Sequence, residues 1–166
     1  MRLNSSKEAL RKERIFIEGG VTLSRTVEAG TLTQIWTGAR IGENVTIGRG
    51  VHIGVHSVIE DDVILGDFSY IGDHAVIGRG VKLPNRSVIE NKMVINKVLQ
   101  YKGEKHVFTH LGGDKLMVGC LIHPIPYWLE NYQEIGKKYG YNEKETEQAF
   151  ELINKINDDR RSHAST

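Results

Sequence analysis

The sequence has little of several features that define other classes of protein. Cys120 is the single cysteine in 166 residues, so no disulfide can form within the chain, and we expect a reducing, cytoplasmic location. No apolar run reaches the roughly 18 residues of a membrane span, and residues 1–14 are charged without an apolar run. We therefore expect neither a transmembrane helix nor a secretory signal. A net charge of +1 argues against partners such as nucleic-acid polymers or anionic membranes.

A repeat of six residues is present over more than half of the chain. Aliphatic residues recur at this spacing at Ile41, Ile47, Ile53, Ile59, Leu65, Ile71, Ile77, Leu83, Ile89 and Ile95, and the frame extends back through Ile35, Ala29, Leu23 and Ile17. Small or β-branched residues follow four positions later, at Val45, Val51, Ser57, Val63, Ser69, Ala75, Val81 and Ser87. This period predicts a β-solenoid, in which each short strand buries two side chains before the chain turns a corner.

At these residues the chain resembles the left-handed β-helix superfamily with hexapeptide repeats. The resemblance implies an all-β solenoid with three hexads per coil, a triangular cross-section and assembly into a homotrimer. Residues that are three hexads apart should then stack at about 4.8 Å. The repeat is weakest between Thr26 and Gln34, where Ala29 replaces an aliphatic residue, and we expect a bulge or small loop there.

The repeat stops near Val98, and a different pattern follows. Two apolar runs, His106–Leu111 and Leu116–Ile122, flank a Gly-Gly-Asp turn and predict a β-hairpin. Two α-helices are predicted, one from Tyr127 to Tyr139 and one after the capping residue Asn142. The expected organisation is an N-terminal helix or arm at 1–14, a left-handed β-helix at 15–98, a hairpin or extended connection at 99–126, a helical appendage at 127–161 and a tail at 162–166.

The C-terminal segment resembles uncharacterised hexapeptide-repeat proteins of phages and prophages. The matching residues are Gly119, Cys120, His123, Trp128, Leu129, Glu130, Asn131, Tyr132, Ile135, Gly136 and Lys137. The resemblance implies a phage or mobile-element origin, and with it a location in the host cytoplasm, but it implies no reaction.

Stacking of the hexads predicts a group of unusual side chains on one face and its following corner. His56 and His74 should share a corner column, and His52 and Tyr70 should stack on the adjoining face. Histidine can hydrogen-bond an anion, and aromatic rings can stack on a planar group. The candidate ligand-binding residues are Trp36, His52, His56, Tyr70, Asp73, His74, Lys92, His106 and His123. The alternative is structural, because solenoid corners tolerate polar residues and histidines at trimer contacts can hydrogen-bond across subunits.

Two enzymatic alternatives and one metal site stand beside this binding site. Carbonic anhydrases of the gamma class bind zinc with two histidines separated by four residues and a third earlier in the chain. Here His52 and His56 are separated by three residues, with no earlier histidine, so that pattern fails. Acyl transfer from acyl-coenzyme A or acyl carrier protein would use His56 or His74 as the general base. A zinc site is a further candidate at His106, His110, Cys120 and His123.

The sequence therefore favours a homotrimer of phage type that captures a small anionic, nucleotide-like ligand in clefts between subunits, and an immune signal of the host is one such ligand. No catalytic residue and no cofactor are expected in this interpretation. The alternatives are a histidine-dependent acyltransferase with coenzyme A, a zinc-dependent enzyme, and a purely structural phage protein.

Overall fold

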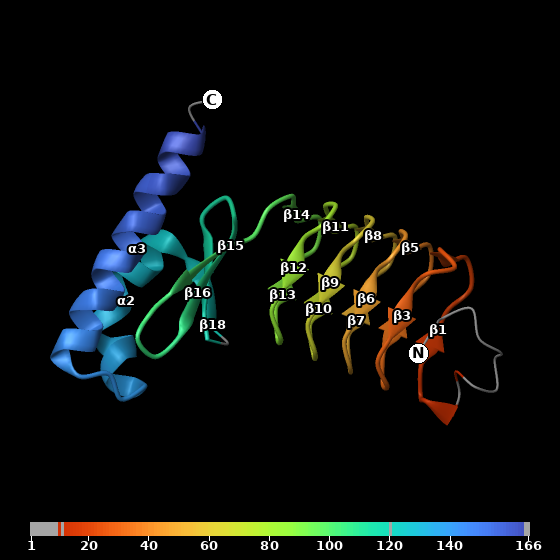
Figure 1. The fold of residues 1–166 in the computed structure, drawn as a ribbon, viewed down its shortest axis with the longest axis horizontal. Coiled ribbons are helices and arrows are strands. Elements are labelled where there is room, and N and C mark those ends of the chain that lie inside the picture. Colours follow the sequence, from red (N-terminus) through yellow and green to blue (C-terminus); the bar gives the residue numbers. More distant parts are fainter. Residues whose placement is uncertain (1–9, 11, 120, 165–166) are drawn as a thin grey trace. The chain divides into compact units, whose positions relative to one another are not determined.

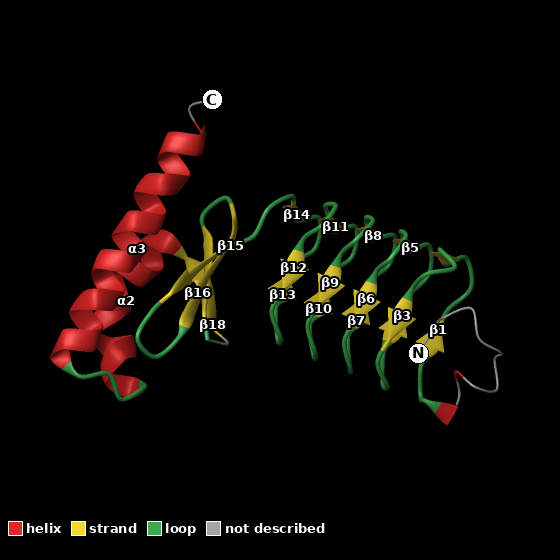
Figure 2. Ribbon diagram, viewed as in Figure 1, coloured by secondary structure: helices red, strands yellow, loops and turns green. Residues whose placement is uncertain are grey.

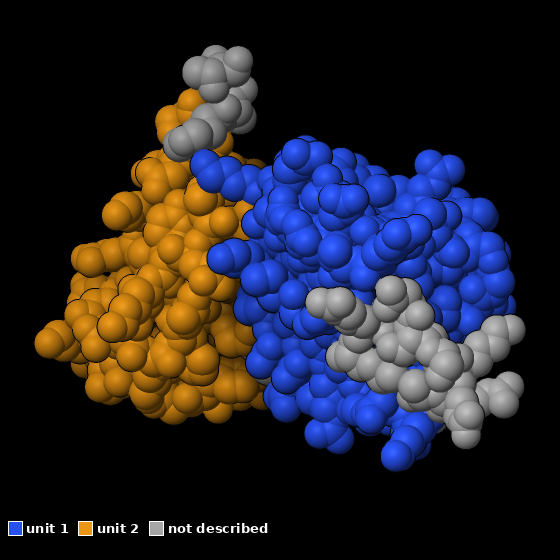
Figure 3. Space-filling model, turned by 45° about the vertical axis from the view of Figure 1, so that its right-hand side comes forward, with its two compact units in different colours: residues 1–97 blue, residues 98–166 orange. Residues whose placement is uncertain are grey.

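The computed structural model describes residues 10, 12–119 and 121–164 of the chain. The chain divides into two compact units, Met1–Lys97 and Val98–Thr166, which Figure 3 colours separately. Most of the predicted N-terminal helix or arm lies outside the described residues, as do Cys120 and the end of the tail.

The first unit is a solenoid of parallel two-residue strands arranged in three sheets (Figures 1 and 2). One sheet contains β1 (Phe16–Ile17), β4 (Gln34–Ile35), β7 (His52–Ile53), β10 (Tyr70–Ile71) and β13 (Val88–Ile89). A second contains β2 (Thr22–Leu23), β5 (Arg40–Ile41), β8 (Val58–Ile59), β11 (Val76–Ile77) and β14 (Val94–Ile95). The third contains β3 (Glu28–Ala29), β6 (Thr46–Ile47), β9 (Ile64–Leu65) and β12 (Lys82–Leu83).

The register of these strands confirms the predicted columns. His52 is paired with Tyr70, and Tyr70 with Val88, so the outward side chains of one face stack in the expected order. The inward aliphatic residues form parallel columns, for example Ile53, Ile71 and Ile89. A hexad period with three hexads per coil is therefore enough to place each outward side chain on its face.

The solenoid core consists of the two inward residues of each hexad. Ile53, Ile71 and Ile89 have no exposed surface, and the small residues four positions after the aliphatic ones are buried with them. Where that small residue is a serine, its hydroxyl has a partner in the turn: the Ser57 hydroxyl donates to the Gly54 carbonyl oxygen at 2.7 Å. Buried polar atoms are thus satisfied within the coil, as burial in an apolar core requires.

The predicted bulge between Thr26 and Gln34 is absent from the structure. β3 pairs with β6 in the regular register, with Glu28 opposite Thr46 and Ala29 opposite Ile47. Ala29 is buried, and the Gly30 N–H donates to the Ile47 carbonyl oxygen at 2.8 Å. The prediction was wrong because the backbone ladder needs only a side chain that fits inside, and alanine satisfies that condition.

Close stacking of the coils leads to a prediction about Gly54. A Cβ atom at this position would lie 2.7 Å from the backbone nitrogen of Asp73 and from the carbonyl carbon of Gly72. The Gly54→Ala substitution should therefore lower the free energy of unfolding by about 1–3 kcal/mol, since the neighbouring coil must shift. Gly19→Ala is the control, because a Cβ there meets nothing within 4 Å. Urea unfolding of both variants checks this, and equal stability would contradict it.

The second unit begins with a four-stranded antiparallel sheet in the order β15-β16-β17-β18. Its strands are β15 (Leu99–Lys102), β16 (Val107–Gly112), β17 (Lys115–Val118) and β18 (Leu121–Pro124). The predicted hairpin is present as β16 and β17. The apolar run Leu116–Ile122, predicted as one strand, instead contributes to two strands, with Gly119 in the left-handed backbone region between them.

Two helices complete the second unit, α2 (Ile125–Lys138) and α3 (Glu143–Ala164). Asn142 caps α3 as predicted: the Glu145 N–H donates to the Asn142 side-chain oxygen at 2.9 Å, and the Asn142 N–H donates to the Glu145 carboxylate at 2.8 Å. The core between sheet and helices contains Phe108, Leu116, Ile125, Trp128, Ile153 and Ile156. Of the helices in the described residues, none combines the length and hydrophobicity that crossing a bilayer requires.

Candidate functional site

A row of rings lies along one face of the solenoid, and we call Phe16, Trp36, His52 and Tyr70 the aromatic ladder. Phe16, His52 and Tyr70 point outward from β1, β7 and β10, and Trp36 directly follows β4. The ring centroids of Phe16 and Trp36 are 5.5 Å apart, and those of Trp36 and His52 are 5.8 Å apart. The rings of His52 and Tyr70 are stacked, with centroids 4.7 Å apart and planes inclined by 10°. Trp36, His52 and Tyr70 are predicted site residues, whereas Phe16 was not predicted.

His52 is the polar member of the aromatic ladder, and its surroundings determine its protonation. The Trp36 indole N–H donates to His52 Nδ1 at 3.1 Å, so Nδ1 has no proton and the neutral ring has its proton on Nε2. Burial lowers the pKa of His52 from its usual 6.5, while the Asp73 carboxylate acts in the opposite direction. At neutral pH the ring is therefore uncharged and offers an N–H donor rather than a base.

Asp73 also has a structural role in the solenoid. Its carboxylate accepts the Val55 N–H at 2.8 Å, and its own N–H donates to the Asn91 side-chain oxygen at 2.9 Å. The same contact recurs where the Asp67 N–H donates to Asn85 at 2.8 Å. At these turn positions an asparagine side chain thus accepts a backbone N–H of the neighbouring coil just as an aspartate does.

That equivalence gives a prediction about the pKa of His52. The Asp73→Asn substitution should keep the hydrogen bond to the Val55 N–H but remove the negative charge that raises the pKa of His52. The pKa of His52 should therefore fall further below 6.5, as measured by an NMR titration of the imidazole signals. Because the unfolded chain takes up this proton first, His52 makes folding less favourable as the pH drops below 6.5. An upward shift of the pKa in the variant would contradict the assignment.

The corner after the aromatic face forms a second column, and we call Gly38, His56, His74 and Lys92 the histidine corner. All four residues have φ between 53° and 71°, in the left-handed region. The rings of His56 and His74 are 5.4 Å apart, and a Cβ atom on Gly38 would lie 2.1 Å from His56 Nδ1, so the His56 ring covers that glycine. Both histidines and Lys92 are exposed. Within the part of the chain that the structure describes, neither imidazole has a hydrogen-bond partner.

The other predicted residues belong to the second unit. His106 Nδ1 is 2.6 Å from the Tyr141 hydroxyl, and the His123 ring contacts Tyr127 and Trp128 at centroid distances of 4.3 and 5.4 Å. His106 and Tyr141 are 35 residues apart, and no sequence pattern connects them.

The predicted zinc ligands have different surroundings from one another. The ring Nε2 of His110 is 3.1 Å from the Gly113 carbonyl oxygen, whereas His106 and His123 have the aromatic partners described above. Cys120 lies outside the described residues. Among the residues that are described, no three His, Cys, Asp or Glu side chains gather as metal ligands would.

Part of the solenoid matches the model of a known protein family. Residues 56–91 match the family model described as Bacterial transferase hexapeptide (six repeats). The matched segment begins at His56 and contains β8 to β13. The solenoid is a hexapeptide-repeat β-helix. Its parallel strands and its period agree with the left-handed superfamily.

Two solved structures are similar to part of this chain. Serine acetyltransferase isoform 3 of Entamoeba histolytica, in complex with cysteine, has 19% sequence identity and a TM-score of 0.45, covering 56% of this chain and 38% of its own. A mutant perosamine N-acetyltransferase of Caulobacter crescentus, in complex with CoA and GDP-perosamine, has 18% identity and a TM-score of 0.30, covering 61% of this chain and 54% of its own. This chain therefore spans about two fifths to one half of their lengths. A comparison with curated protein sequences finds no match.

Proposed function

We propose that the aromatic ladder and the histidine corner bind a small anionic, nucleotide-like ligand and release it unchanged. The observation that supports this most is the stack of His52 on Tyr70, because it presents an ordered ring face on the solenoid surface. Tyr70 is 41% exposed, so a planar base can reach it. Stacking of a base on an aromatic side chain contributes about 1–3 kcal/mol.

The polar groups around the stack suit an anionic ligand with hydrogen-bond acceptors. His52 offers its Nε2–H, since Trp36 occupies Nδ1. His56, His74 and Lys92 follow at the adjoining corner, where the lysine is positively charged and the imidazoles can donate. Coils held by continuous backbone ladders keep these groups in place before the ligand arrives, so little entropy is lost on binding.

The hydrogen bonding of His52, His56 and His74 favours binding of a ligand without chemistry. A general base needs a free ring nitrogen in a fixed orientation. Nδ1 of His52 already accepts a hydrogen bond, and His56 and His74 have no orienting partner among the described residues. These imidazoles suit hydrogen bonding to a ligand better than proton abstraction from one.

Acyl transfer is the second candidate function, and one specific observation favours it. The segment that matches the bacterial transferase hexapeptide model includes both His56 and His74. In that case one of these histidines would remove a proton from the acceptor hydroxyl or amine as it attacks the thioester carbonyl of acyl-coenzyme A, and free coenzyme A would leave as the thiol. Coenzyme A contains an adenine nucleotide, so the aromatic ladder would suit part of it as well.

The assembly and origin of the protein belong to the same proposal. We propose a homotrimer with the ligand in clefts between subunits, since the exposed Val94, on the sheet that also contains the outward residues Val58 and Val76, favours a covered surface. Capture of a host immune nucleotide in the host cytoplasm rests on the resemblance of the C-terminal segment to phage proteins.

A thermal-shift screen of the full chain tests the proposal. The compounds are cyclic nucleotides, sugar nucleotides, ADP-ribose derivatives, acyl-CoAs and zinc, and each hit is examined by chromatography after incubation. A ligand present at 100 times its Kd stabilises the folded protein by about 2.7 kcal/mol. A nucleotide that stabilises the protein and is recovered intact supports capture. Consumption of an acyl-CoA in the presence of an acceptor would overturn it in favour of acyl transfer.

Matched variants then place the ligand on the solenoid. His56→Asn and His74→Asn should weaken binding, because asparagine tolerates the left-handed backbone but lacks the imidazole. Asp62→Asn is the control, since Asp62 has the same backbone conformation, with φ of 60°, at a different corner. Equal affinity in all three variants would move the ligand away from the histidine corner.

A further inference from the structure

A second candidate site lies wholly within the second unit and is independent of the solenoid site. It is a cavity of about 70 Å³ between the sheet and the two helices, within a hollow of about 540 Å³ that extends to solvent. Trp128, Leu121, Ile135 and Ala149 are among its apolar lining residues. A water molecule occupies about 30 Å³ in the liquid, so the enclosed part holds two or three carbon-sized groups, and a slightly longer molecule extends into the open hollow.

One edge of this cavity is polar. His106 and Tyr141 line it and are joined by a 2.6 Å contact between Nδ1 and the hydroxyl. The Nε2 edge of the imidazole lies beside Gly119, which lines the same cavity: a Cβ atom on that glycine would be 3.6 Å from Nε2. Burial raises the pKa of the Tyr141 hydroxyl, which therefore stays protonated at neutral pH.

The His106–Tyr141 pair keeps one donor and one acceptor free in either arrangement of its shared proton. If the tyrosine hydroxyl donates to Nδ1, the imidazole Nε2–H remains a donor and the hydroxyl oxygen an acceptor. If Nδ1–H donates to the hydroxyl, the hydroxyl proton remains a donor and Nε2 an acceptor. An alcohol, which both donates and accepts, satisfies the pair in both cases.

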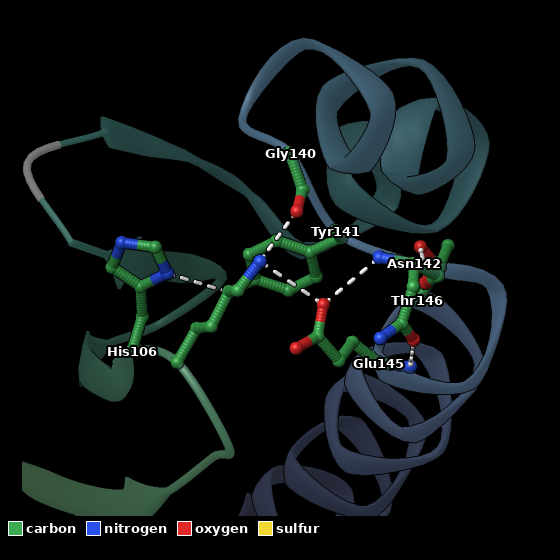
Figure 4. A network of polar contacts seen from close by, with 7 residues as sticks. His106, Gly140, Tyr141, Asn142, Glu145 and Thr146 are labelled. Carbon is green, nitrogen blue, oxygen red and sulfur yellow. Dashed lines mark hydrogen bonds and ion pairs between the residues drawn. The ribbon is translucent and has the colours of Figure 1, made fainter.

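The wall that contains Tyr141 is fixed by its own contacts, which Figure 4 shows. The Lys105 ammonium lies 5.2 Å from the Tyr141 ring centroid, donates to the Gly140 carbonyl oxygen, and is 3.1 Å from the Glu145 carboxylate. Glu145 in turn belongs to the capping box with Asn142. The tyrosine is thus held in position without a ligand, and such preorganised sites lose little entropy on binding.

The Trp128 wall is fixed as well, because its indole N–H donates to the Leu116 carbonyl oxygen at 2.9 Å inside the core. Its polar atom has a partner, and the ring faces the cavity as a purely apolar surface.

We propose that this cavity binds a small molecule that has a short aliphatic end and one hydroxyl group, with the hydroxyl at the His106–Tyr141 pair. The aliphatic end occupies the apolar part beside Leu121 and Ala149.

Methyl NMR of the full chain tests this assignment with two probes, xenon and 1-butanol. Both should shift the methyl signals of Val118, Leu121, Ile135 and Ile153, since small apolar cavities bind xenon. Tyr141→Phe should keep the xenon response and weaken 1-butanol binding about tenfold, the loss expected for one hydrogen bond. No response to xenon would overturn the cavity. A response to xenon without one to 1-butanol, or an unchanged 1-butanol affinity in Tyr141→Phe, would overturn the ligand class.

Cavity-filling variants provide the structural control. Ala149→Leu should remove both responses, and Val118→Ile, which adds one methylene, should reduce them in a protein that is less disturbed. Gln148→Leu introduces the same side chain one position away, in a residue that does not line this cavity, and should leave both responses unchanged. Retention of the responses in Ala149→Leu or in Val118→Ile would place the probes elsewhere.

Discussion

Replacing Ile71 by alanine should lower the free energy of unfolding of the solenoid by about 2–5 kcal/mol. Ile71 has no exposed surface, and β10 places it between Ile53 and Ile89 in the core column. The coils above and below are joined to it by backbone hydrogen bonds, so they cannot collapse freely into the space that the removed carbons leave. The cost should therefore include a cavity contribution as well as the lost burial.

The two tryptophans allow this effect to be measured in one unit at a time. Trp36 belongs to the solenoid and Trp128 to the second unit, and no other tryptophan is present. With 5-fluorotryptophan, the two ¹⁹F signals follow unfolding in urea separately at a fixed protein concentration. The Trp36 signal should report the loss of stability in Ile71→Ala.

Val88→Ala is the matched control for this substitution. It removes an aliphatic side chain that is 46% exposed on the same sheet, and it should change the stability by less than about 0.5 kcal/mol. A loss below about 1 kcal/mol for Ile71→Ala, or equal losses for both variants, would show that the inward column does not dominate the stability of the solenoid.

The solenoid could be predicted from the sequence because its contacts are periodic. Each coil repeats one geometry, so the spacing of Ile53 and Ile71 determines which outward residues are neighbours, and the pairing of His52 with Tyr70 follows. The same logic should have found Phe16, which precedes Ile17 in the hexad frame and lies two coils from His52. Phe16 is less evident in the sequence because Ala29 interrupts the run of large aliphatic residues between Ile17 and the regular hexads.

The second unit was less predictable because its contacts are not periodic. Local signals placed the hairpin turn and the capping residue Asn142, since turns and caps depend on a few neighbouring residues. The partner of His106 is Tyr141, a contact between the loop that precedes β16 and a distant interhelical loop, and it depends on how the helices pack on the sheet. Strand β15 and the cavity beside Trp128 result from the same packing, which neither composition nor spacing specifies.

Replacing Tyr70 by alanine should weaken binding of a nucleotide ligand found in the screen by roughly 5- to 150-fold, the equivalent of about 1–3 kcal/mol of stacking. The ring of Tyr70 is both the exposed surface for the base and the support on which His52 is stacked. Its removal should also leave the His52 ring without its parallel neighbour, so the Nε2–H donor becomes less well oriented. Isothermal titration calorimetry with the recovered ligand measures the change.

Tyr70→Phe separates stacking from hydrogen bonding at this position. If the ring face is what the ligand uses, phenylalanine should retain most of the affinity, whereas an equal loss in both variants would assign the effect to the hydroxyl. Val88→Ala, one coil further along the same column, should leave the affinity unchanged because Val88 offers no ring. His52→Phe completes the series: it preserves a stacked ring but removes both the N–H donor and the acceptor of the Trp36 indole N–H, so its loss relative to the unmodified chain measures the polar contribution of His52 as a whole. A ligand that is insensitive to Tyr70→Ala and to His52→Phe would not bind at the aromatic ladder, and the proposed site would be wrong even if capture itself occurs.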